Sequence, residues 1–173
     1  MPENLGIMLI RRIQPSDRPH LAAVQIESWK DTYADVLPAA YLAEQVTEDL
    51  QRHWRTVIIQ PEDIVRVAED DAIIGFISVW CRPDPFIDNL HVKPAQRSKG
   101  VGSKLLVSAA RLMRRQGHSS AYLWVFEKNR RAIELYSRLG AVRTEHALKN
   151  IFGHKVPCVK MVWSSISVLC TIG

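Results

Sequence analysis

The sequence has no apolar run long enough to cross a bilayer. Its longest candidate, residues 72–81, is about half of the roughly 18–20 residues that a membrane-spanning helix needs, and it contains Gly75 and Ser78. The first residues, Met1-Pro2-Glu3-Asn4, carry an acid and no basic segment, so a signal peptide is not expected. We therefore expect no membrane partner.

The sequence also has few cysteines, and they are poorly placed for structural chemistry. Cys81, Cys158 and Cys170 are odd in number and far apart in the chain. This spacing excludes a disulfide framework and a CxxC motif for zinc or redox chemistry, so no metal site is expected. Unpaired thiols suit a reducing compartment, and the predicted location is the cytoplasm.

Acidic residues are nearly absent from one long stretch of the chain. Residues 93–131 contain ten basic residues and a single acid, Glu127, for a net charge of +9. The remaining thirteen basic and seventeen acidic residues give the rest of the chain a net charge of −4. A basic helix face exposed to solvent would look the same, but such a segment is also typical of a site that binds an anion.

Hydrophobic periodicity changes along the chain and indicates an α/β (α+β) protein, a mixed sheet with helices on its faces. The length of 173 residues fits a single domain over residues 1–173, with a core at about 9–163 and a tail, 164–173, that carries no clear pattern. Apolar runs predict strands at 5–13, 65–68, 73–81, 86–92, 121–126, 141–148 and 156–163. Helix-start residues, with Ser16 as the first N-cap, predict helices at 16–31, from Pro38, from Thr47 to before Pro61, at 102–116 and at 129–139.

A glycine-containing loop lies inside the basic stretch, between a predicted strand and a predicted helix. It reads Gln96-Arg97-Ser98-Lys99-Gly100-Val101-Gly102-Ser103. The N-terminus of the following helix carries about half a positive charge and unpaired N–H groups, which bind phosphate readily. The order differs from a Walker A loop and from a GxGxxG fingerprint, which would need a glycine at Leu105. A glycine-rich helix start without any ligand is the simpler alternative.

Three segments resemble the GCN5-related N-acetyltransferase (GNAT) family. Residues 97–102 are similar to its Q/R-x-x-G-x-G/A loop, and residues 129–141 to its N-x-x-A-x-x-x-Y-x-x-x-G-F segment, with Ala141 in place of the usual phenylalanine. Residues 28–33, followed by Leu37-Pro38, look like the substrate-side helices of many members. The resemblance covers Leu9 to Trp163 and implies the GNAT acyl-CoA N-acyltransferase fold, with a mostly antiparallel mixed sheet of about six or seven strands flanked by about four helices.

The resemblance also implies that acetyl-CoA is the co-substrate and lies between two strands that separate. Main-chain groups of Leu90 and Val92 would pair with its pantetheine arm, and the Leu90 N–H would polarise the thioester carbonyl and hold the oxyanion. Asn129 would bond the pantetheine, and Arg130 or Arg131 the adenosine phosphates. The residues expected at the cofactor are Leu90, His91, Val92, Arg97, Ser98, Lys99, Gly100, Val101, Gly102, Ser103, Asn129 and Arg131.

Acetylation of an amine needs one group that takes a proton from the amine and another that protonates the departing thiolate. Tyr136 matches the general acid of the family, although a tyrosine packed in the core would show the same pattern. Asp88, two residues before Leu90, is the expected base, while a solvated or capping role for it, Glu27 as the base and a water-mediated path stay open. His91 faces away from Leu90, as a core histidine with hydrogen-bond partners would.

Trp29, Tyr33 and Trp80 are candidates for the acceptor pocket, although large aromatic residues more often belong to the core. The predicted function is direct transfer of an acetyl group from acetyl-CoA to a primary amine of a small molecule or peptide, without a covalent intermediate on Cys81. A coenzyme A sensor of the same fold is the alternative. Residues 93–131 lack a recognition helix or aromatic platform, so no nucleic acid is expected as a partner. The exposed C-terminal strands and the apolar tail favour a homodimer.

Overall fold

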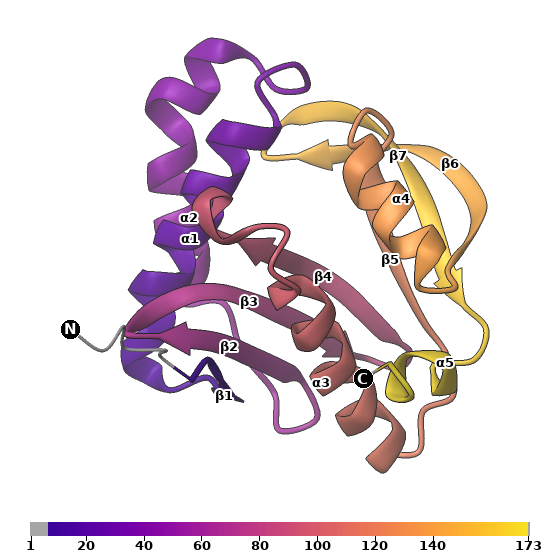
Figure 1. Ribbon diagram of the computed structural model, residues 1–173. Coiled ribbons are helices and arrows are strands. Elements are labelled where there is room, and N and C mark those ends of the chain that lie inside the picture. Colours follow the sequence, from indigo (N-terminus) through magenta and orange to yellow (C-terminus); the bar gives the residue numbers. More distant parts are fainter. Residues whose placement is uncertain (1–6, 173) are drawn as a thin grey trace.

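The computed structural model describes residues 7–172, which form a twisted seven-stranded sheet with helices on both faces (Figure 1). Its strands are β1 (Leu9–Arg12), β2 (Ile64–Asp70), β3 (Ala72–Cys81), β4 (Pro85–Val92), β5 (Ala121–Phe126), β6 (Val142–Ile151) and β7 (His154–Trp163). Its helical elements are η1 (Pro15–Asp17), α1 (Arg18–Thr32), η2 (Tyr41–Gln45), α2 (Val46–Thr56), η3 (Pro94–Gln96), α3 (Val101–Arg115), α4 (Arg130–Arg138) and α5 (Ser167–Cys170).

The sheet is mixed and mostly antiparallel, which confirms the predicted fold class. The strands lie in the order β1-β2-β3-β4-β5-β7-β6, and every neighbouring pair is antiparallel except β4 and β5. Parallel neighbours require the chain to cross over the sheet between them, and α3 makes this crossover. The loop before α3 is therefore held beside the carboxyl end of β4.

The sheet opens between β4 and β5. These strands pair at two positions, Phe86 with Tyr122 and Ile87 with Leu123. Within the described residues no later part of β4 pairs with β5, and the two strands diverge (Figure 1). On their other sides β4 stays paired with β3 as far as Val92, and β5 with β7 as far as Phe126. The gap thus opens inside an otherwise continuous sheet.

The core lies on both faces of the sheet. On one face α3 buries an apolar side that includes Leu105, Leu106 and Met113, none of them exposed. On the other face α1 and α2 bury residues such as Leu21 and Trp54. The amphipathic pattern of α2 and α3 predicts one buried face on each of these two helices. No helix among residues 7–172 combines the length and the apolarity needed to cross a membrane.

The C-terminal tail, for which the sequence showed no pattern, belongs to the core on the α3 side. Ile166 is 1% exposed and Leu169 is fully buried, and both join the cluster around α3. The Ile166 N–H donates to the Ser119 carbonyl at 2.9 Å. These two side chains pack inside the protein and are not available to contact a second subunit. The expectation of an apolar tail that is free to do so is therefore wrong for them.

The start of the first helix differs from the prediction, and part of the first predicted strand, residues 5–6, lies outside the described residues. Ser16 is not an N-cap, because Pro15–Asp17 form the short turn η1 before α1 begins at Arg18. Asp17 closes this turn instead, accepting the Gln14 N–H at 2.7 Å and pairing with Arg11 at 2.8 Å. The Arg11 guanidinium holds the pKa of the Asp17 carboxyl below its usual range.

The two helices predicted around residue 47 form one continuous helical segment. η2 is a π-helical stretch that runs directly into α2 at Val46, so the expected break before Thr47 is absent from the described chain. Tyr41 and Leu42 are buried together with Val46 and Leu50. The wider π turn brings these apolar side chains to the same face, which a regular helical spacing did not reveal.

Candidate active site

One cavity of about 1070 Å³ occupies the gap between β4 and β5 and reaches both faces of the sheet. We call the part next to the α3 loop and α4 the loop side; it is lined by Leu90, Val92, Arg97, Ser98, Gly100–Ser103, Asn129, Arg131, Tyr136 and Arg138. We call the part next to α1, α2 and the β6–β7 turn the aromatic side; it is lined by Gln25, Ser28, Trp29, Tyr33, Leu50, His53, Phe86, Asp88, Asn89, His91, Tyr122, Trp124, Phe126, Lys149 and Phe152.

On the loop side, the main chain before α3 adopts left-handed conformations at two positions. Ser98 has φ +64° and Gly100 has φ +78°, and α3 begins immediately afterwards at Val101. Alternating left-handed residues turn successive N–H groups toward the same point and form a concavity suited to an anion. A Cβ added to Gly100 would meet no described atom within 4 Å, so the space in front of the loop is open.

The basic residues near this loop take different positions. Arg131 reaches the loop from the start of α4, and its Nη2 donates to Ser98 Oγ at 3.1 Å. Arg97 lines the cavity, but its guanidinium turns to α1, where it pairs with Asp31 and donates to Thr32 Oγ1 at 3.1 Å. Lys99 lies outside the cavity lining, with Nζ 3.4 Å from Gln96 Oε1. Of the three, Arg131 is the one whose charge faces the loop.

The main chain of β4 presents its polar groups to the gap at the two residues expected from the family resemblance. The Lys93 N–H donates to the Ile74 carbonyl on β3 at 2.8 Å. Because main-chain bonds alternate in direction along an antiparallel strand, His91 also bonds toward β3, while the N–H and C=O groups of Leu90 and Val92 point away from it. They therefore face the opening toward β5.

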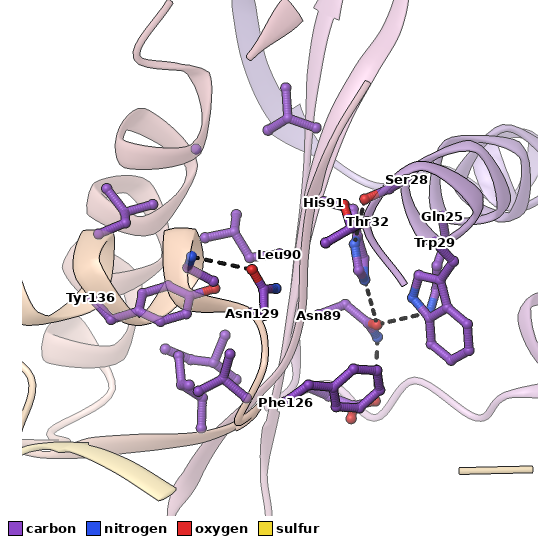
Figure 2. Close-up of a pocket in the computed structure, with 18 of the residues that line it drawn as sticks. Gln25, Ser28, Trp29, Thr32, Asn89, Leu90, His91, Phe126, Asn129 and Tyr136 are labelled. Atoms are coloured by element: carbon purple, nitrogen blue, oxygen red, sulfur yellow. Dashed lines mark hydrogen bonds between the residues drawn. The ribbon is translucent and has the colours of Figure 1, made fainter. Parts of the chain in front are cut away.

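Tyr136 and Asn129 stand opposite this part of β4. Figure 2 shows both on the side of β4 that carries the Leu90 side chain. Asn129 caps α4, because its Oδ1 accepts the Ala132 N–H at 3.3 Å. Tyr136 packs edge-on against Trp163 and is 7% exposed, and burial raises the pKa of its phenol. The residue is thus both a core tyrosine and a protonated hydroxyl at the cavity wall.

Asp88 lies on the aromatic side because β4 contains a bulge. Ser78 pairs with Asn89 and Val79 with Ile87, which leaves Asp88 as the extra residue. Strict alternation would place Asp88 on the same side as Leu90. Instead its carboxylate accepts the Trp80 Nε1–H at 2.9 Å and the Asn89 side-chain N–H at 3.3 Å. Trp80 itself is absent from the cavity lining and reaches the cavity only through its hydrogen bond to Asp88. This corrects the expectation that the Trp80 ring lines an acceptor pocket.

His91 is the centre of a buried polar network that the sequence did not reveal. Its Nδ1 lies 3.2 Å from Ser28 Oγ and its Nε2 lies 3.3 Å from Asn89 Oδ1 (Figure 2). Burial lowers the pKa of His91 to about 3, and Arg97 acts in the same direction. In the neutral ring Nε2 must carry the hydrogen, since an amide oxygen can only accept, and Nδ1 accepts the Ser28 hydroxyl. This bears out the alternative of a core histidine with partners.

The network joins the two sides of the cavity. Arg97 Nη2 donates to Ser28 Oγ at 3.2 Å, which ties the loop to α1. Gln25 Nε2 donates to Asn89 Oδ1 at 3.1 Å, and Asn89 Nδ2 donates to Ser78 Oγ at 2.9 Å. Asn89 thus forms hydrogen bonds with both the His91 ring and the Asp88 carboxylate. A displacement of the loop or of α1 would therefore change the position of Asp88 through this network.

Aromatic rings form the outer wall of the aromatic side. Trp29 packs edge-on against Tyr33 at 5.4 Å and Phe152 at 6.1 Å between ring centres, and Tyr33 lies 4.4 Å from Phe126. Trp29 and Tyr33 thus both line the cavity, and their role in binding an acceptor stays a prediction. Burial raises the pKa of Tyr33 to about 12, while the Asn129 side chain acts in the opposite direction.

Other groups at the cavity were missed or misplaced by sequence reasoning. His53 lines the aromatic side, and burial lowers its pKa while Asp88 acts against this. Helical spacing on α2 could have placed it near Trp54, but nothing local points to the cavity. Glu27 lies on the exposed face of α1, outside the cavity lining, and is thus poorly placed to act as a base. Burial raises the pKa of both Cys81 and Cys158 to about 11, so these thiols stay protonated at neutral pH.

Comparison with known proteins yields consistent similarities. A family model described as the acetyltransferase (GNAT) family matches residues 26–141. An uncharacterised N-acetyltransferase of Bacillus subtilis, YuaI, is 24% identical over 174 residues, covering 96% of this chain and 98% of that protein. A spermidine N(1)-acetyltransferase of Thermoplasma acidophilum is 27% identical over 138 residues, covering 76% and 86%. The solved structure of the PaiA N-acetyltransferase of the same organism with coenzyme A has a TM-score of 0.69 and 22% identity, covering 89% and 98%.

Proposed function

The chain belongs to the acetyltransferase (GNAT) family, and we propose that it transfers an acetyl group from acetyl-CoA to the primary amine of a small molecule or peptide. When bound, acetyl-CoA supplies an activated acetyl thioester. The observation that carries the proposal is the single cavity through the gap between β4 and β5, with a loop whose conformation suits an anion on one side and a carboxylate on the other. Such a passage lets two substrates meet directly in a ternary complex.

The loop side fits coenzyme A in shape and charge. The N–H groups of residues 98–103 would hold the diphosphate, with Arg131 beside them. The free main-chain groups of Leu90 and Val92 would bond the pantetheine arm as an added strand does. The Leu90 N–H would donate to the carbonyl oxygen of the thioester and stabilise the negative charge that develops on it.

Asp88 and Tyr136 are assigned the proton transfers. Asp88 takes a proton from the ammonium of the acceptor, whose nitrogen can then form the new bond to carbon. Tyr136 gives a proton to the sulfur as the carbon–sulfur bond breaks, and one proton is released to solvent overall. The burial that raises the pKa of Tyr136 supports the role of acid, because it keeps the phenol protonated. The hydrogen bonds from Trp80 and Asn89 support the role of Asp88 by fixing its carboxylate.

The acceptor would bind on the aromatic side, against Trp29 and Tyr33. A thialysine N-epsilon-acetyltransferase of Bos taurus is 36% identical over 64 residues, 37% of this chain and 38% of that protein, and it and the spermidine enzyme are named for small amines. These names support a small-molecule amine as the acceptor here. Free thiols at Cys81, Cys158 and Cys170 suit the cytoplasm, where we propose the protein works.

The homodimer expected from the C-terminal strands stays a prediction. Ile166 and Leu169 of the tail are buried, so the exposed apolar residues on this side that remain for a homodimer include Val168 of the tail and Val142 and Leu148 of the edge strand β6. Sedimentation of the protein over a range of concentrations tests it, and a monomer at every concentration would contradict it.

The proposed activity is tested by mixing the protein with acetyl-CoA and a set of primary amines. Release of free thiol, measured against a reaction without amine, and the mass of the N-acetylated product report transfer. We expect thiol release that depends on both substrates and matches the amount of product. Binding of acetyl-CoA without product from any amine would contradict the proposal and favour a sensor of the same fold.

A further inference from the structure

Two hydrogen-bond donors on the aromatic side have no hydrogen-bond partner among residues 7–172. They are the ammonium of Lys149 on β6 and the indole N–H of Trp29 on α1, and both residues line the cavity. Asp88 lines the same side and is the only carboxylate among the described residues of the cavity lining. The acceptor pocket thus offers one negative group, one positive group and one neutral donor.

Lys149 and Lys160 make similar contacts with aromatic rings but differ in their ionic partners. Both Lys149 and Lys160 lie over aromatic rings of β5, with Nζ 3.9 Å from the centre of Trp124 and 4.8 Å from the centre of Tyr122, respectively. Lys160 also pairs with Glu145 at 3.4 Å and lies outside the cavity lining. Lys149, which is half-buried, has no carboxylate within ion-pair distance among residues 7–172. A positive charge held in this way attracts an anionic group from the cavity.

The Trp29 N–H is the second hydrogen-bond donor without a partner among the described residues. Trp29 is 7% exposed, and its Nε1 is buried without any hydrogen-bond partner among the described residues. An indole N–H can only donate, and a buried donor without a partner is unfavourable because it has lost its hydrogen bond to water. Its ring lies 6.5 Å from Phe126, two residues along β5 from the Trp124 ring under Lys149 (Figure 2 shows Trp29 and Phe126). The two donors therefore lie along the same stretch of β5, at Trp124 and at Phe126.

We propose that the acceptor is a small zwitterionic amine, such as an amino acid, whose ammonium lies at Asp88 and whose carboxylate lies at Lys149 and the Trp29 N–H. This inference rests on the proposed function and names the substrate class of the same site. A polyamine would bring several further positive charges to a pocket with one carboxylate and a resident lysine. Like charges in a partly desolvated pocket repel, so the pocket selects against a polyamine.

Matched pairs of amines that differ by a carboxylate test the inference. The pairs are L-lysine and cadaverine, L-ornithine and putrescine, and L-phenylalanine and phenethylamine, with spermidine as the polyamine. Thiol release from acetyl-CoA gives kcat/KM for each. We expect the carboxylate-bearing member of at least one pair to be preferred by about tenfold or more over its partner and over spermidine.

Variants locate the preference in the pocket. Lys149→Met keeps an unbranched side chain, one atom shorter, and removes the charge, so it should raise KM for the carboxylate-bearing amine about tenfold and leave its partner nearly unchanged. Trp29→Phe keeps a ring and removes the N–H, with a smaller effect in the same direction. Lys155→Met is the matched control, because Lys155 is exposed on the same hairpin and lies outside the cavity lining. It should change neither value.

The outcomes separate this inference from the proposed function. Equal turnover within every pair, preference for the amines without a carboxylate, or a carboxylate preference unchanged in Lys149→Met would overturn the inference while acetyl transfer stands. Absence of turnover with every amine would overturn the proposed function instead. The inference is then decided by calorimetric binding of the three amino acids, which must be weaker in Lys149→Met than in the unmodified protein for at least one of them and would contradict it otherwise.

Discussion

The two sides of the cavity are built from different parts of the chain. The loop side is built around main-chain groups at the end of β4 and the start of α3, with side chains contributed by α4 and the residue before it. The aromatic side is mostly side chains, contributed by α1, α2, β4, β5 and the β6–β7 turn. Main-chain N–H groups are the same in every residue, so the loop side needs a conformation more than particular side chains. The aromatic side depends on which side chains meet.

This difference explains what each side indicates about its ligand. The loop side indicates a cofactor that a whole family shares, and the aromatic side indicates the acceptor of an individual enzyme. A diphosphate is common to all uses of coenzyme A, and a glycine loop ahead of a helix suffices to hold it. In the proposed function, an acceptor is recognised by the placement of Asp88, Trp29 and Lys149, which come from three separate elements. Changes on the loop side should therefore abolish cofactor binding, while changes on the aromatic side should alter turnover and selectivity.

The largest effect is expected at Gly100. Gly100→Glu places a side chain at φ +78° and a negative charge where the diphosphate would lie, so the affinity for acetyl-CoA should fall by more than about 100-fold. Calorimetry or protection against thermal unfolding measures this. Gly117→Glu is the matched control, because Gly117 has φ +90° with no described atom near an added Cβ and lies outside the cavity lining. Equal loss in both variants would show strain, not a phosphate site.

The next effect is expected at Asp88, on the aromatic side. Asp88→Asn keeps the shape and removes the proton acceptor, so kcat should fall about 100-fold with acetyl-CoA affinity unchanged. Steady-state kinetics over pH measures both values. Asp84→Asn, an exposed acid in the turn before β4, is the control and should behave like the unmodified protein. A normal kcat in Asp88→Asn would remove Asp88 from the reaction and leave a water-mediated path.

Tyr136 lies on the loop side but is expected to act through its side chain, and it belongs both to the core and to the cavity wall. Tyr136→Phe keeps the packing against Trp163 and removes the hydroxyl, so kcat should fall about tenfold while acetyl-CoA affinity and thermal stability stay nearly constant. Full activity would leave Tyr136 as a packing residue alone. A loss of stability with unchanged kcat per folded molecule would lead to the same conclusion.

The smallest effect concerns stability at His91, which connects the two sides. The folded state keeps His91 neutral down to about pH 3, whereas the unfolded chain binds a proton near pH 6.5. The unfolded state therefore holds more protons in this range, so the contribution of this group to the free energy of unfolding should fall as the pH drops from 6.5 to 5. Denaturant unfolding at several pH values measures the slope. His91→Gln should show a shallower slope, and an unchanged slope would contradict the assignment.

Much of the fold could be predicted because it follows local patterns. Apolar periodicity located every strand, and 121–126 was predicted with the bounds that β5 has. The errors came where tertiary contacts decide: the π-helical η2 merges with α2, and the tail is ordered because Ile166 and Leu169 fill a space beside α3. A segment of ten residues with no periodicity carries no sign of the surface on which it packs.

Positions at the candidate site could be predicted only as far as they are local. The roles of the loop, Leu90, Asn129 and Tyr136 stay predictions, but these residues do surround one cavity. Arg97 was expected to add charge at the loop, yet its guanidinium is held by Asp31 on α1. This ion pair depends on how closely α1, which is distant in the sequence, approaches the loop. The spacing of residues within 93–131 carries no information about that distance.

The amino-acid sequence by itself determined the order of strands and helices, the glycine loop ahead of α3 and the positive charge around it. These features depend on residues close together in the chain, where backbone preference and hydrophobic period act directly. Only the tertiary structure decided which side of β4 carries Asp88, which partners keep His91 neutral, and that Lys149 and Trp29 share a pocket. A bulge in one strand and the packing of α1 against a divided sheet set these placements, because they bring together groups that the chain holds far apart.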